Sequence, residues 1–288
     1  MRTTVRNIVI TVASITILAA CGASNDEATT SGDGTGNECT AGKTIADGTL
    51  TIATGNPAFS PWVENDAPEQ KEGFEAAVAY AIAAELGYSD EQVTWVRTGF
   101  DEAIQPGAKN FDFNLQQFSV TPEREQTVSF SDPYYTTNQA IVGYPDSLAG
   151  DATSVADLKG LKFGVQAGTT SLEFLQTVIA PDTEAFVYDD NAAAKAALEA
   201  KQIDAIVVDL PTAFYIAAVE IEGAAVIGQF PATAGGTADE FGLLFDLGNP
   251  LVECVNAALS SLRESGQLAT IEQTWLSDKT NAPIIATE

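Results

Sequence analysis

One arginine and one aspartate have the chemistry needed to bind the two charged ends of a zwitterion. Arg124 ends the run 119–124, Ser-Val-Thr-Pro-Glu-Arg, and Asp209 follows the apolar run 205–208. A guanidinium binds a carboxylate through two parallel hydrogen bonds, and a carboxylate pairs with an ammonium group. By themselves, these strings are also consistent with a surface arginine at a helix start and with an aspartate that caps a helix beginning at Pro211.

Hydroxyl groups close to these two positions in the sequence can complete a shell around a small zwitterion. Ser119 and Thr121 share the arginine's loop, although Thr121 is also suited to capping the next helix. The run 168–170, Gly-Thr-Thr, follows an apolar strand and precedes a predicted helix. Free N–H groups at a helix start attract anions, and glycine lets the backbone approach them. We therefore expect Thr169 and Thr170 at a ligand, with a plain turn as the alternative.

The elements that must position these residues alternate between strands and helices from Thr49 onward. Apolar residues at Phe74, Val78 and Ile82 recur every four positions, which predicts a helix with one apolar face. Alternating strands and helices indicate an α/β fold with largely parallel sheets, and such sheets bind ligands at the carboxyl ends of their strands. Strands are predicted at 50–53, 93–96, 111–118, 140–142, 162–165, 186–188, 205–208 and 242–245, and helices at 191–200, with Asn191 as N-cap, and 211–220.

The composition restricts the class of partner. The formal net charge is −27, from 13 Lys and Arg against 40 Asp and Glu, and there is no histidine. A surface this acidic argues against nucleic acid, because phosphate binding needs a basic face. Without histidine, and with the cysteines assigned as below, we expect no zinc site, no other metal and no cofactor. The length of 288 residues accommodates two lobes of about 100 residues each, and a cleft between them would be a small-molecule site.

The N-terminus predicts export. Residues 1–20 combine a basic start with a short apolar run, and they end in Leu-Ala-Ala before Cys21. This arrangement resembles a bacterial lipoprotein signal, in which the cysteine accepts a lipid and anchors the chain to a membrane. An ordinary signal peptide with an incidental cysteine, or a buried apolar strand, is the alternative. Residues 21–46 are polar and small, which predicts a lipidated N-terminus followed by a flexible tether.

Two cysteines remain after Cys21, namely Cys39 and Cys254. Because exported proteins meet oxidising conditions, we expect these two to form a disulfide, with two unpaired thiols as the alternative.

Four strings in residues 47–280 together resemble the bacterial extracellular solute-binding proteins of family 3, the amino-acid-binding branch of periplasmic solute-binding proteins. The resemblance implies two α/β lobes of the type II periplasmic-binding-protein fold, with an interdomain cleft and two hinge crossings. The first lobe would comprise 47–140 and 233–280, the second 141–232, and residues 281–288 would be a tail. The strings are GNPAFSPW at 55–62, FEAAVAYAI at 74–82, SVTPER at 119–124 with FSDPYY at 130–135, and GTTS at 168–171 with Asp209.

The resemblance also assigns roles to residues. Arg124 would hold the ligand carboxylate together with Thr170, and Asp209 would hold the ammonium group. Phe59 and Trp62 would pack against the ligand side chain, with a place in the core as the alternative for aromatics in such a turn. The remaining expected contacts are Ser119, Thr121, Thr169 and Gln117.

The sequence departs from the family pattern at one position that bears on the ligand. Many relatives carry an aspartate where this chain has Gly55, which argues against a lysine- or arginine-type ligand. Gln116 and Gln117 would instead contact a polar neutral or acidic side chain.

The resemblance implies a protein that is not an enzyme. It would be a monomeric, lipid-anchored component of an ABC importer on the outer face of the cell membrane. It would close over a free, polar amino acid and deliver it to the permease and ATPase complex. A dehydratase-like enzyme on the same scaffold is one alternative, and a sensor subunit that reports the amino acid to a membrane partner is another. A sensor would use the same binding residues, so the sequence does not separate sensing from transport.

Overall fold

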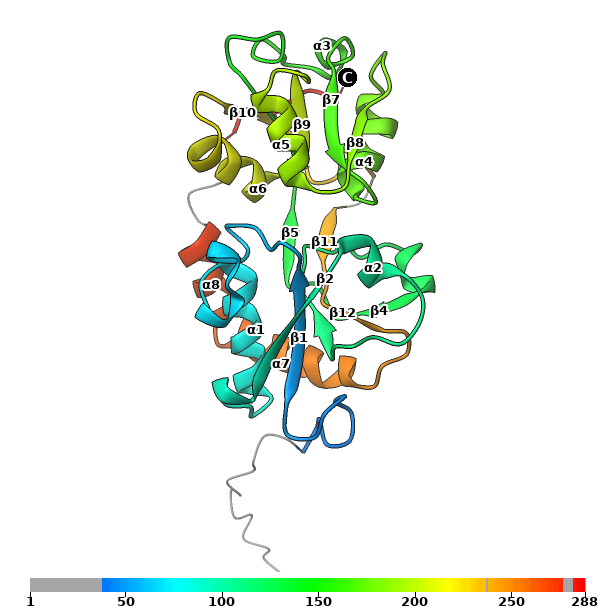
Figure 1. The fold of residues 1–288 in the computed structure, drawn as a ribbon, viewed down its shortest axis with the longest axis vertical. Coiled ribbons are helices and arrows are strands. Elements are labelled where there is room, and N and C mark those ends of the chain that lie inside the picture. The colour runs from blue at the N-terminus through cyan, green and yellow to red at the C-terminus, as the bar shows by residue number, and fades with distance from the viewer. Residues whose placement is uncertain (1–37, 237, 277–281, 288) are drawn as a thin grey trace, which may run out of the picture. The chain divides into compact units, whose positions relative to one another are not determined.

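Two five-stranded sheets organise the chain in the computed structural model, which describes residues 38–236, 238–276 and 282–287 (Figure 1). The predicted signal segment and Cys21 lie outside these residues. The first sheet has the order β2-β1-β3-β12-β4 and the second the order β10-β6-β9-β7-β8. The strands of the first are Val93–Thr98, Leu50–Gly55, Phe113–Asn114, Leu244–Asp246 and Val128–Phe130, in that order. Those of the second are Ala225–Gln229, Gln139–Gly143, Ala205–Asp209, Phe163–Gln166 and Phe186–Tyr188.

Each sheet with its helices is called a lobe below. The first lobe carries α1, α2, α7 and α8, and the second carries α3, α4, α5 and α6. The bounds of the first group are Phe74–Glu85, Phe100–Ile104, Leu251–Glu264 and Gln267–Leu276. Those of the second group are Val155–Leu158, Thr170–Phe174, Asn191–Glu199 and Leu210–Tyr215.

The strand β1 pairs in parallel with β2 and β3, and β7 pairs in parallel with β8 and β9. The sheets are mixed rather than largely parallel, because β12 and β6 each make antiparallel pairs with two neighbours. The strands predicted from apolar runs are present. Four others were not predicted, namely β4, β10, Tyr135–Thr137 (β5) and Asp239–Phe241 (β11). The carboxyl ends of β1 and β9, where ligands of such sheets bind, carry Gly55 and Asp209.

The second sheet is covered on both faces. Successive residues of β9 alternate between two cores, with Val207 in the one that contains α4 and Ile206 in the one that contains α5 and α6. In the first lobe, α1, α7 and α8 pack on one face of the sheet through Phe74, Leu259 and their neighbours. Buried apolar strands of this kind fix the sheet edges from which the site residues project.

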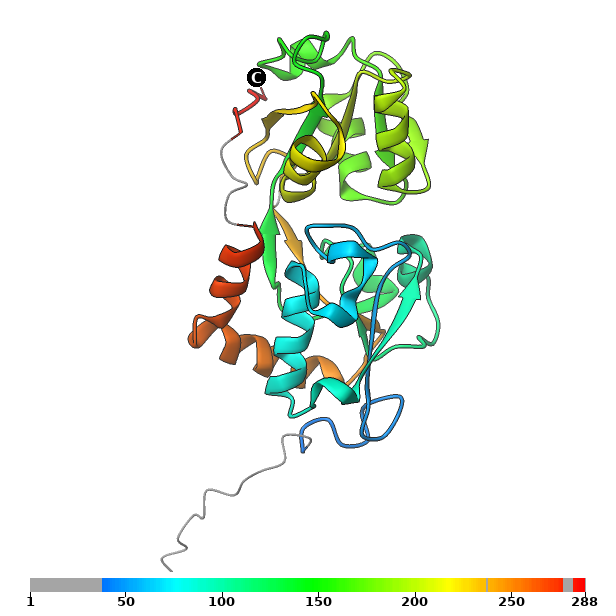
Figure 2. The same cartoon turned by 60° about the vertical axis from the view of Figure 1, so that its left-hand side comes forward.

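Two antiparallel strands connect the lobes. The strand β5, Tyr135–Thr137, pairs with β11, Asp239–Phe241, and Figure 2 shows them side by side between the lobes. Because each strand belongs to a separate passage of the chain, this small sheet supplies the two expected crossings.

Residues 282–287, which were predicted to be part of a tail, are bound to the second lobe. Ile284 forms a bridge with Gln229 of β10, and Ala286 forms one with Ser154. Ile285 is 1% exposed in the core of the second lobe, over Gly228, where a Cβ would lie 2.6 Å from its side chain. The chain therefore returns to the second lobe after α8. Six residues are too few for a periodic pattern, so this return to the second lobe was not predicted.

The folded region also begins earlier than residue 47. Cys39 and Cys254 form a disulfide with a Cα–Cα distance of 5.9 Å, as expected. Thr40 is buried and shares a 2.8 Å hydrogen bond with the hydroxyl of Tyr88. The Ile45 N–H donates to the Asp112 carboxylate at 2.7 Å. Residues 38–46 are therefore held against the first lobe at a few points, although most of them are exposed and their polar composition predicted a tether.

Among the helices of the described residues, none has both the length and the apolar character that crossing a bilayer requires.

We expect the double variant Cys39→Ser/Cys254→Ala to lose about 2–4 kcal/mol of unfolding free energy, because the bridge restricts the unfolded chain. The cysteines are 215 residues apart, so the bridge closes most of the chain into one loop. Urea unfolding monitored by circular dichroism measures the loss. Wild-type protein in reductant should unfold at the same urea midpoint as the variant. Equal midpoints for the variant and the wild type without reductant would contradict the expectation.

Candidate ligand-binding site

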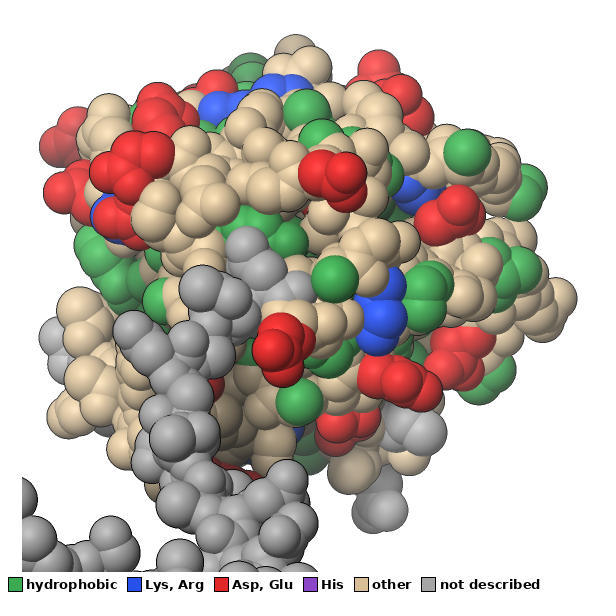
Figure 3. All heavy atoms as spheres, turned by 90° about the horizontal axis from the view of Figure 1, so that it is seen from below, with side chains coloured by type: hydrophobic (Ala, Val, Ile, Leu, Met, Phe, Trp, Pro, Cys, Tyr) green, Lys and Arg blue, Asp and Glu red, His purple; other side chains and the backbone are tan. Residues whose placement is uncertain are grey.

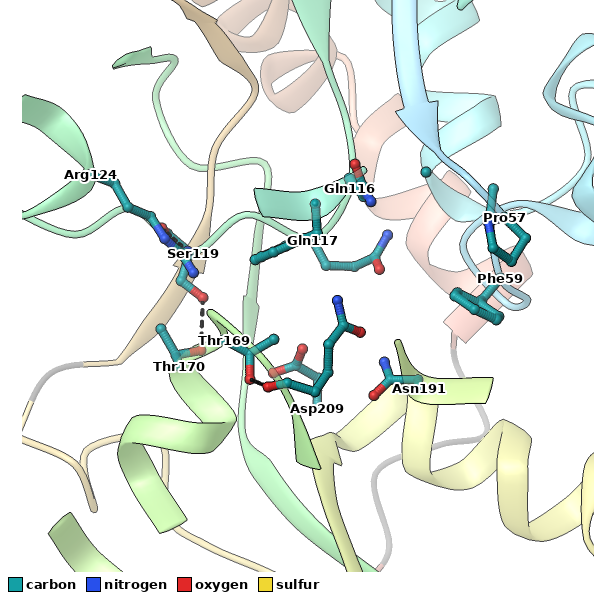
Figure 4. Close-up of a pocket in the computed structure, with 14 residues that line it drawn as sticks. Pro57, Phe59, Gln116, Gln117, Ser119, Arg124, Thr169, Thr170, Asn191 and Asp209 are labelled. Atoms are coloured by element: carbon teal, nitrogen blue, oxygen red, sulfur yellow. Dashed lines mark hydrogen bonds between the residues drawn. The ribbon is translucent and has the colours of Figure 1, made fainter. Parts of the chain in front are cut away.

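A polar pocket lies where the carboxyl ends of β1 and β9 meet. It contains about 550 Å³ of empty space, part of it open to solvent. Figure 4 shows that its walls come from both lobes. The lining residues are Gly55, Pro57, Ala58, Phe59, Phe100, Gln116, Gln117, Ser119, Arg124, Gln166, Thr169, Thr170, Asn191 and Asp209.

Arg124 is held in place by neutral oxygens. Its Nη1 donates to the Ser119 carbonyl at 2.7 Å and its Nη2 to the Gly168 carbonyl at 3.0 Å, one in each lobe. The side chain is 8% exposed and lies over the Phe100 ring, 5.4 Å from its centre. Burial lowers the pKa of the guanidinium, while nearby carboxylates, chiefly Asp239, raise it. An arginine keeps its charge in such a setting, so the pocket contains a fixed cation.

Asp209 is held by an amide rather than by a cation. Gln139 Nε2 donates to Asp209 Oδ1 at 2.9 Å and to Asp239 Oδ2 at 2.8 Å. The Gln139 oxygen accepts from Ser171 Oγ at 2.6 Å, which fixes the amide orientation. Burial, and then the Asp239 charge, raise the pKa of Asp209 well above its ordinary value, whereas Gln139 and Arg124 lower it. A cation arriving at this carboxylate would favour its ionised form.

The capping alternative for Asp209 finds no support in the geometry. Asp209 occupies the N-cap position of α6, but its side chain accepts no hydrogen bond from that helix.

The two lobes touch around the pocket through direct hydrogen bonds. Ser119 Oγ lies 3.2 Å from Thr170 Oγ1, and the Trp62 indole donates to Thr212 Oγ1 at 2.8 Å. Trp62 is 1% exposed among other aromatic rings and does not line the pocket. Its place is thus in the contact between the lobes and not at the ligand side chain. These bonds indicate that the lobes are closed.

The threonines predicted at the ligand differ in their positions and hydrogen bonds. Thr169 is the N-cap of α4, since its hydroxyl accepts from the Leu172 N–H at 3.1 Å and donates to the Gln166 carbonyl at 2.9 Å. Thr121 is not among the lining residues. Its hydroxyl accepts from the Arg124 N–H at 3.2 Å in the turn before the short helix Arg124–Gln126, whose N-cap residue is Glu123. Arg124, Asp209, Thr170, Ser119, Phe59, Gln117 and Thr169 all line the same pocket.

The N-cap of α5 is Asp190, whose side chain accepts from the Ala193 N–H at 2.8 Å. Asn191 was predicted to cap this helix, and instead it lines the pocket.

Behind the pocket lies a buried acid that sequence reasoning did not single out. Glu75, 1% exposed, accepts from the Gln117 N–H at 2.8 Å, from the Gln117 side-chain Nε2 and from the Tyr134 hydroxyl. Burial raises the pKa of Glu75 to about 7, against the effect of these hydrogen bonds. One feature of the sequence could have identified Glu75, because it is a glutamate next to Phe74 at the start of an otherwise apolar helix. Gln139 and Gln166 were also missed, and nothing local distinguishes them from surface glutamines.

On the face in Figure 3, acidic side chains are spread widely, with basic ones at a few places between them. Throughout the described ranges, no group of three or more His, Cys, Asp or Glu side chains is placed to hold a metal ion.

A pocket closed between two α/β lobes on paired crossing strands defines a two-lobed binding protein of the type II periplasmic fold. Residues 50–278 match the family model of bacterial extracellular solute-binding proteins, family 3. The chain belongs to this family and is a solute-binding protein.

Several known proteins are similar to this chain over most of its length. A protein of Escherichia coli (strain K12), named as an ABC transporter arginine-binding protein, is 30% identical over 236 residues, which cover 79% of this chain and 90% of the relative. A solved structure of an ancestral arginine-binding protein bound to glutamine has a TM-score of 0.66 at 30% identity, covering 80% and 98% of the two chains. The ancestral amino acid-binding protein AncCDT-1, a precursor of cyclohexadienyl dehydratase, gives 0.64 at 30% identity, covering 80% and 95%.

We expect Glu75 to make the protein less stable as the pH rises. Its pKa is about 7 in the folded chain against an ordinary 4.5. The native state therefore binds its proton more tightly, and the stabilisation is complete below pH 4.5 and lost as the pH rises through 7. The loss should be roughly 2–4 kcal/mol of unfolding free energy.

Urea unfolding of the wild type and of Glu75→Gln gives the unfolding free energy at each pH in this range. The difference between the two slopes of unfolding free energy against pH measures the contribution of Glu75. Glu69→Gln, a substitution of an exposed glutamate, should leave the slope of the wild type unchanged. A Glu75→Gln slope equal to that of the wild type would contradict the assignment.

Proposed function

We propose that this chain binds a free amino acid in the pocket and delivers it to an ABC importer in the cell membrane. The observation that carries the proposal is the placement of Arg124 and Asp209 in one pocket, on different lobes. The ligand carboxylate lies at the guanidinium, with the hydroxyls of Ser119 and Thr170 beside it. The ammonium group lies at Asp209, whose other partner is the Gln139 amide. Both ends of the zwitterion then have charge-assisted hydrogen bonds.

Burial makes this pairing selective for zwitterions. Arg124 is 8% exposed, and it shares no salt bridge with another side chain of the described residues. Leaving one buried charge without its partner costs several kcal/mol, so a ligand that lacks either group binds poorly. In this proposal, the lobes defined by the two five-stranded sheets open at β5 and β11 and close over the ligand.

The relatives support this ligand class. One is named for arginine, one solved structure holds glutamine, and a third is described as amino acid-binding. The partner in this proposal is the permease and ATPase complex of an ABC transporter, to which a monomer of this chain delivers its ligand.

We propose that binding occurs without turnover, although one similar protein is the precursor of a dehydratase. The sequence has no histidine, so a catalytic base would have to be a carboxylate. Asp209 is the acid among the described pocket-lining residues, and the Gln139 amide holds it for the ammonium group. Glu75 accepts three hydrogen bonds and does not line the pocket.

We further propose that Cys21 carries a lipid that holds the protein at the outer face of the membrane. The support is the order of basic start, apolar run and small residues before the cysteine. Family members are extracellular by the family's own description.

Cys21→Ser should move the protein from the membrane fraction to the medium or periplasm, because one acylated residue provides the anchor. Mass spectrometry of the mature wild-type N-terminus should find a diacylglyceryl-modified Cys21, with residues 1–20 removed. An unmodified cysteine, or membrane association that survives the substitution, would overturn the anchor.

We expect Arg124→Ala to weaken amino-acid binding by roughly 2–5 kcal/mol, because the ligand carboxylate loses its buried partner. Isothermal titration calorimetry with the tightest-binding amino acid measures this loss. Arg263→Ala removes an exposed arginine of the same lobe, outside the pocket, and should bind normally. Near-normal affinity of Arg124→Ala would remove Arg124 from the site.

A further inference from the structure

The end of the pocket far from Arg124 has no charged side chain among its described lining residues. In Figure 4, Arg124, Ser119 and Thr170 lie at one side, while Pro57, Phe59 and Asn191 lie at the other. Among the described lining residues, Arg124 and Asp209 are the charged side chains, and both are assigned to the ends of the zwitterion. A charged ligand side chain would be desolvated here without a counter-charge, which is costly.

The orientation of the Gln117 amide is fixed by Glu75. The Gln117 N–H donates to Glu75 Oε1 at 2.8 Å, and the side-chain Nε2 donates to Glu75 Oε2. Above its pKa of about 7, Glu75 is ionised and only accepts hydrogen bonds, so the NH₂ group of Gln117 must then face Glu75. The amide oxygen remains, and no donor among the described residues reaches it. Gln117 lines the pocket, so this oxygen is available there as an acceptor.

The backbone of Gln117 supports the same geometry. Its φ of 52° lies in the left-handed region that few side chains adopt. The bond from its N–H to the buried Glu75 holds this conformation, so Glu75 positions both the backbone and the amide of Gln117.

The neighbouring Gln116 has the opposite orientation. Asn114 Nδ2 donates to Thr98 Oγ1 at 2.9 Å, and that hydroxyl donates to Gln116 Oε1 over a longer 3.5 Å. The Gln116 NH₂ group then lies toward Gly55, another lining residue, 3.1 Å from where a Cβ on that glycine would be. The two glutamines therefore offer the pocket an acceptor and a donor.

We propose that the ligand is an amino acid with a carboxamide side chain, glutamine or asparagine, and that Glu75 is the positioning residue that sets this preference through Gln117. The proposal rests on the proposed function. A carboxamide supplies one donor and one acceptor, which match Gln117 and Gln116. A guanidinium or ammonium group only donates and a carboxylate only accepts, so each leaves one glutamine without its partner.

Calorimetric titration of the purified wild type with glutamine, asparagine, glutamate, aspartate, arginine, lysine, serine and norvaline tests the ligand class. One of the two carboxamides should bind tightest, by about tenfold or more over its acidic analogue. If any other amino acid binds tightest, the carboxamide inference is overturned and the amino-acid-binding function stands. If none binds, the proposed function itself fails.

The role of Glu75 is tested by the ratio of glutamine to glutamate affinity, which loss of stability alone would not change. Glu75→Gln no longer forces the NH₂ group of Gln117 away from the pocket, so the ratio should fall by about threefold or more. Asp112→Asn is the matched control, because Asp112 is also buried and accepts two backbone N–H bonds, at the other end of β1.

The control should keep the wild-type ratio. If Glu75→Gln does not fold, Gln117→Leu removes the acceptor directly and should lower the ratio in the same way. A ratio that stays at the wild-type value in the folded variant overturns the role of Glu75 and Gln117.

Discussion

The site depends on two buried charges that the protein leaves without charged partners. Arg124 is held by the carbonyl oxygens of Ser119 and Gly168, and Asp209 by the amide of Gln139. Neutral groups fix the position of each charge but do not neutralise it. Because an uncompensated buried charge is unfavourable, a ligand that brings both opposite charges stabilises the closed lobes. In the proposed function, recognition and closure are therefore the same event.

Residues at the ends of β5 and β11, the strands that join the lobes, form hydrogen bonds with residues of the site. Gln139 begins β6, two residues after the end of β5, and Asp239, its second partner, begins β11. Tyr134 precedes β5 and donates to Glu75, which in turn holds Gln117 at the pocket. Gln139 thus contacts the lining residue Asp209 directly, whereas Tyr134 reaches the lining residue Gln117 through Glu75. A change at the hinge would change the pocket through these hydrogen bonds, because they share side chains.

Sequence reasoning succeeded where the signal was local. The apolar run before Asp209 predicted a buried strand, and the rule for strand ends then located the acid at the pocket. The family resemblance brought Arg124 to the same place. Reasoning failed where composition was misleading. Residues 38–46 are polar and mostly exposed, yet the disulfide to Cys254 and the carboxylate of Asp112 hold them to the first lobe. Thr121 was expected at the ligand, but its hydroxyl accepts from the Arg124 N–H within its own turn, and it does not line the pocket.

By itself, the sequence determined the periodic elements and the ends of the buried strands, because both follow from side chains a few residues apart. It did not determine which groups meet behind the pocket. Glu75 and Gln117 are 42 positions apart, Gln139 and Asp239 are 100 apart, and Ile285 enters the second core after a passage from the first lobe. Such contacts depend on how sheets and crossing strands bring distant segments together. No local pattern of polarity encodes that, so the tertiary structure alone decided it.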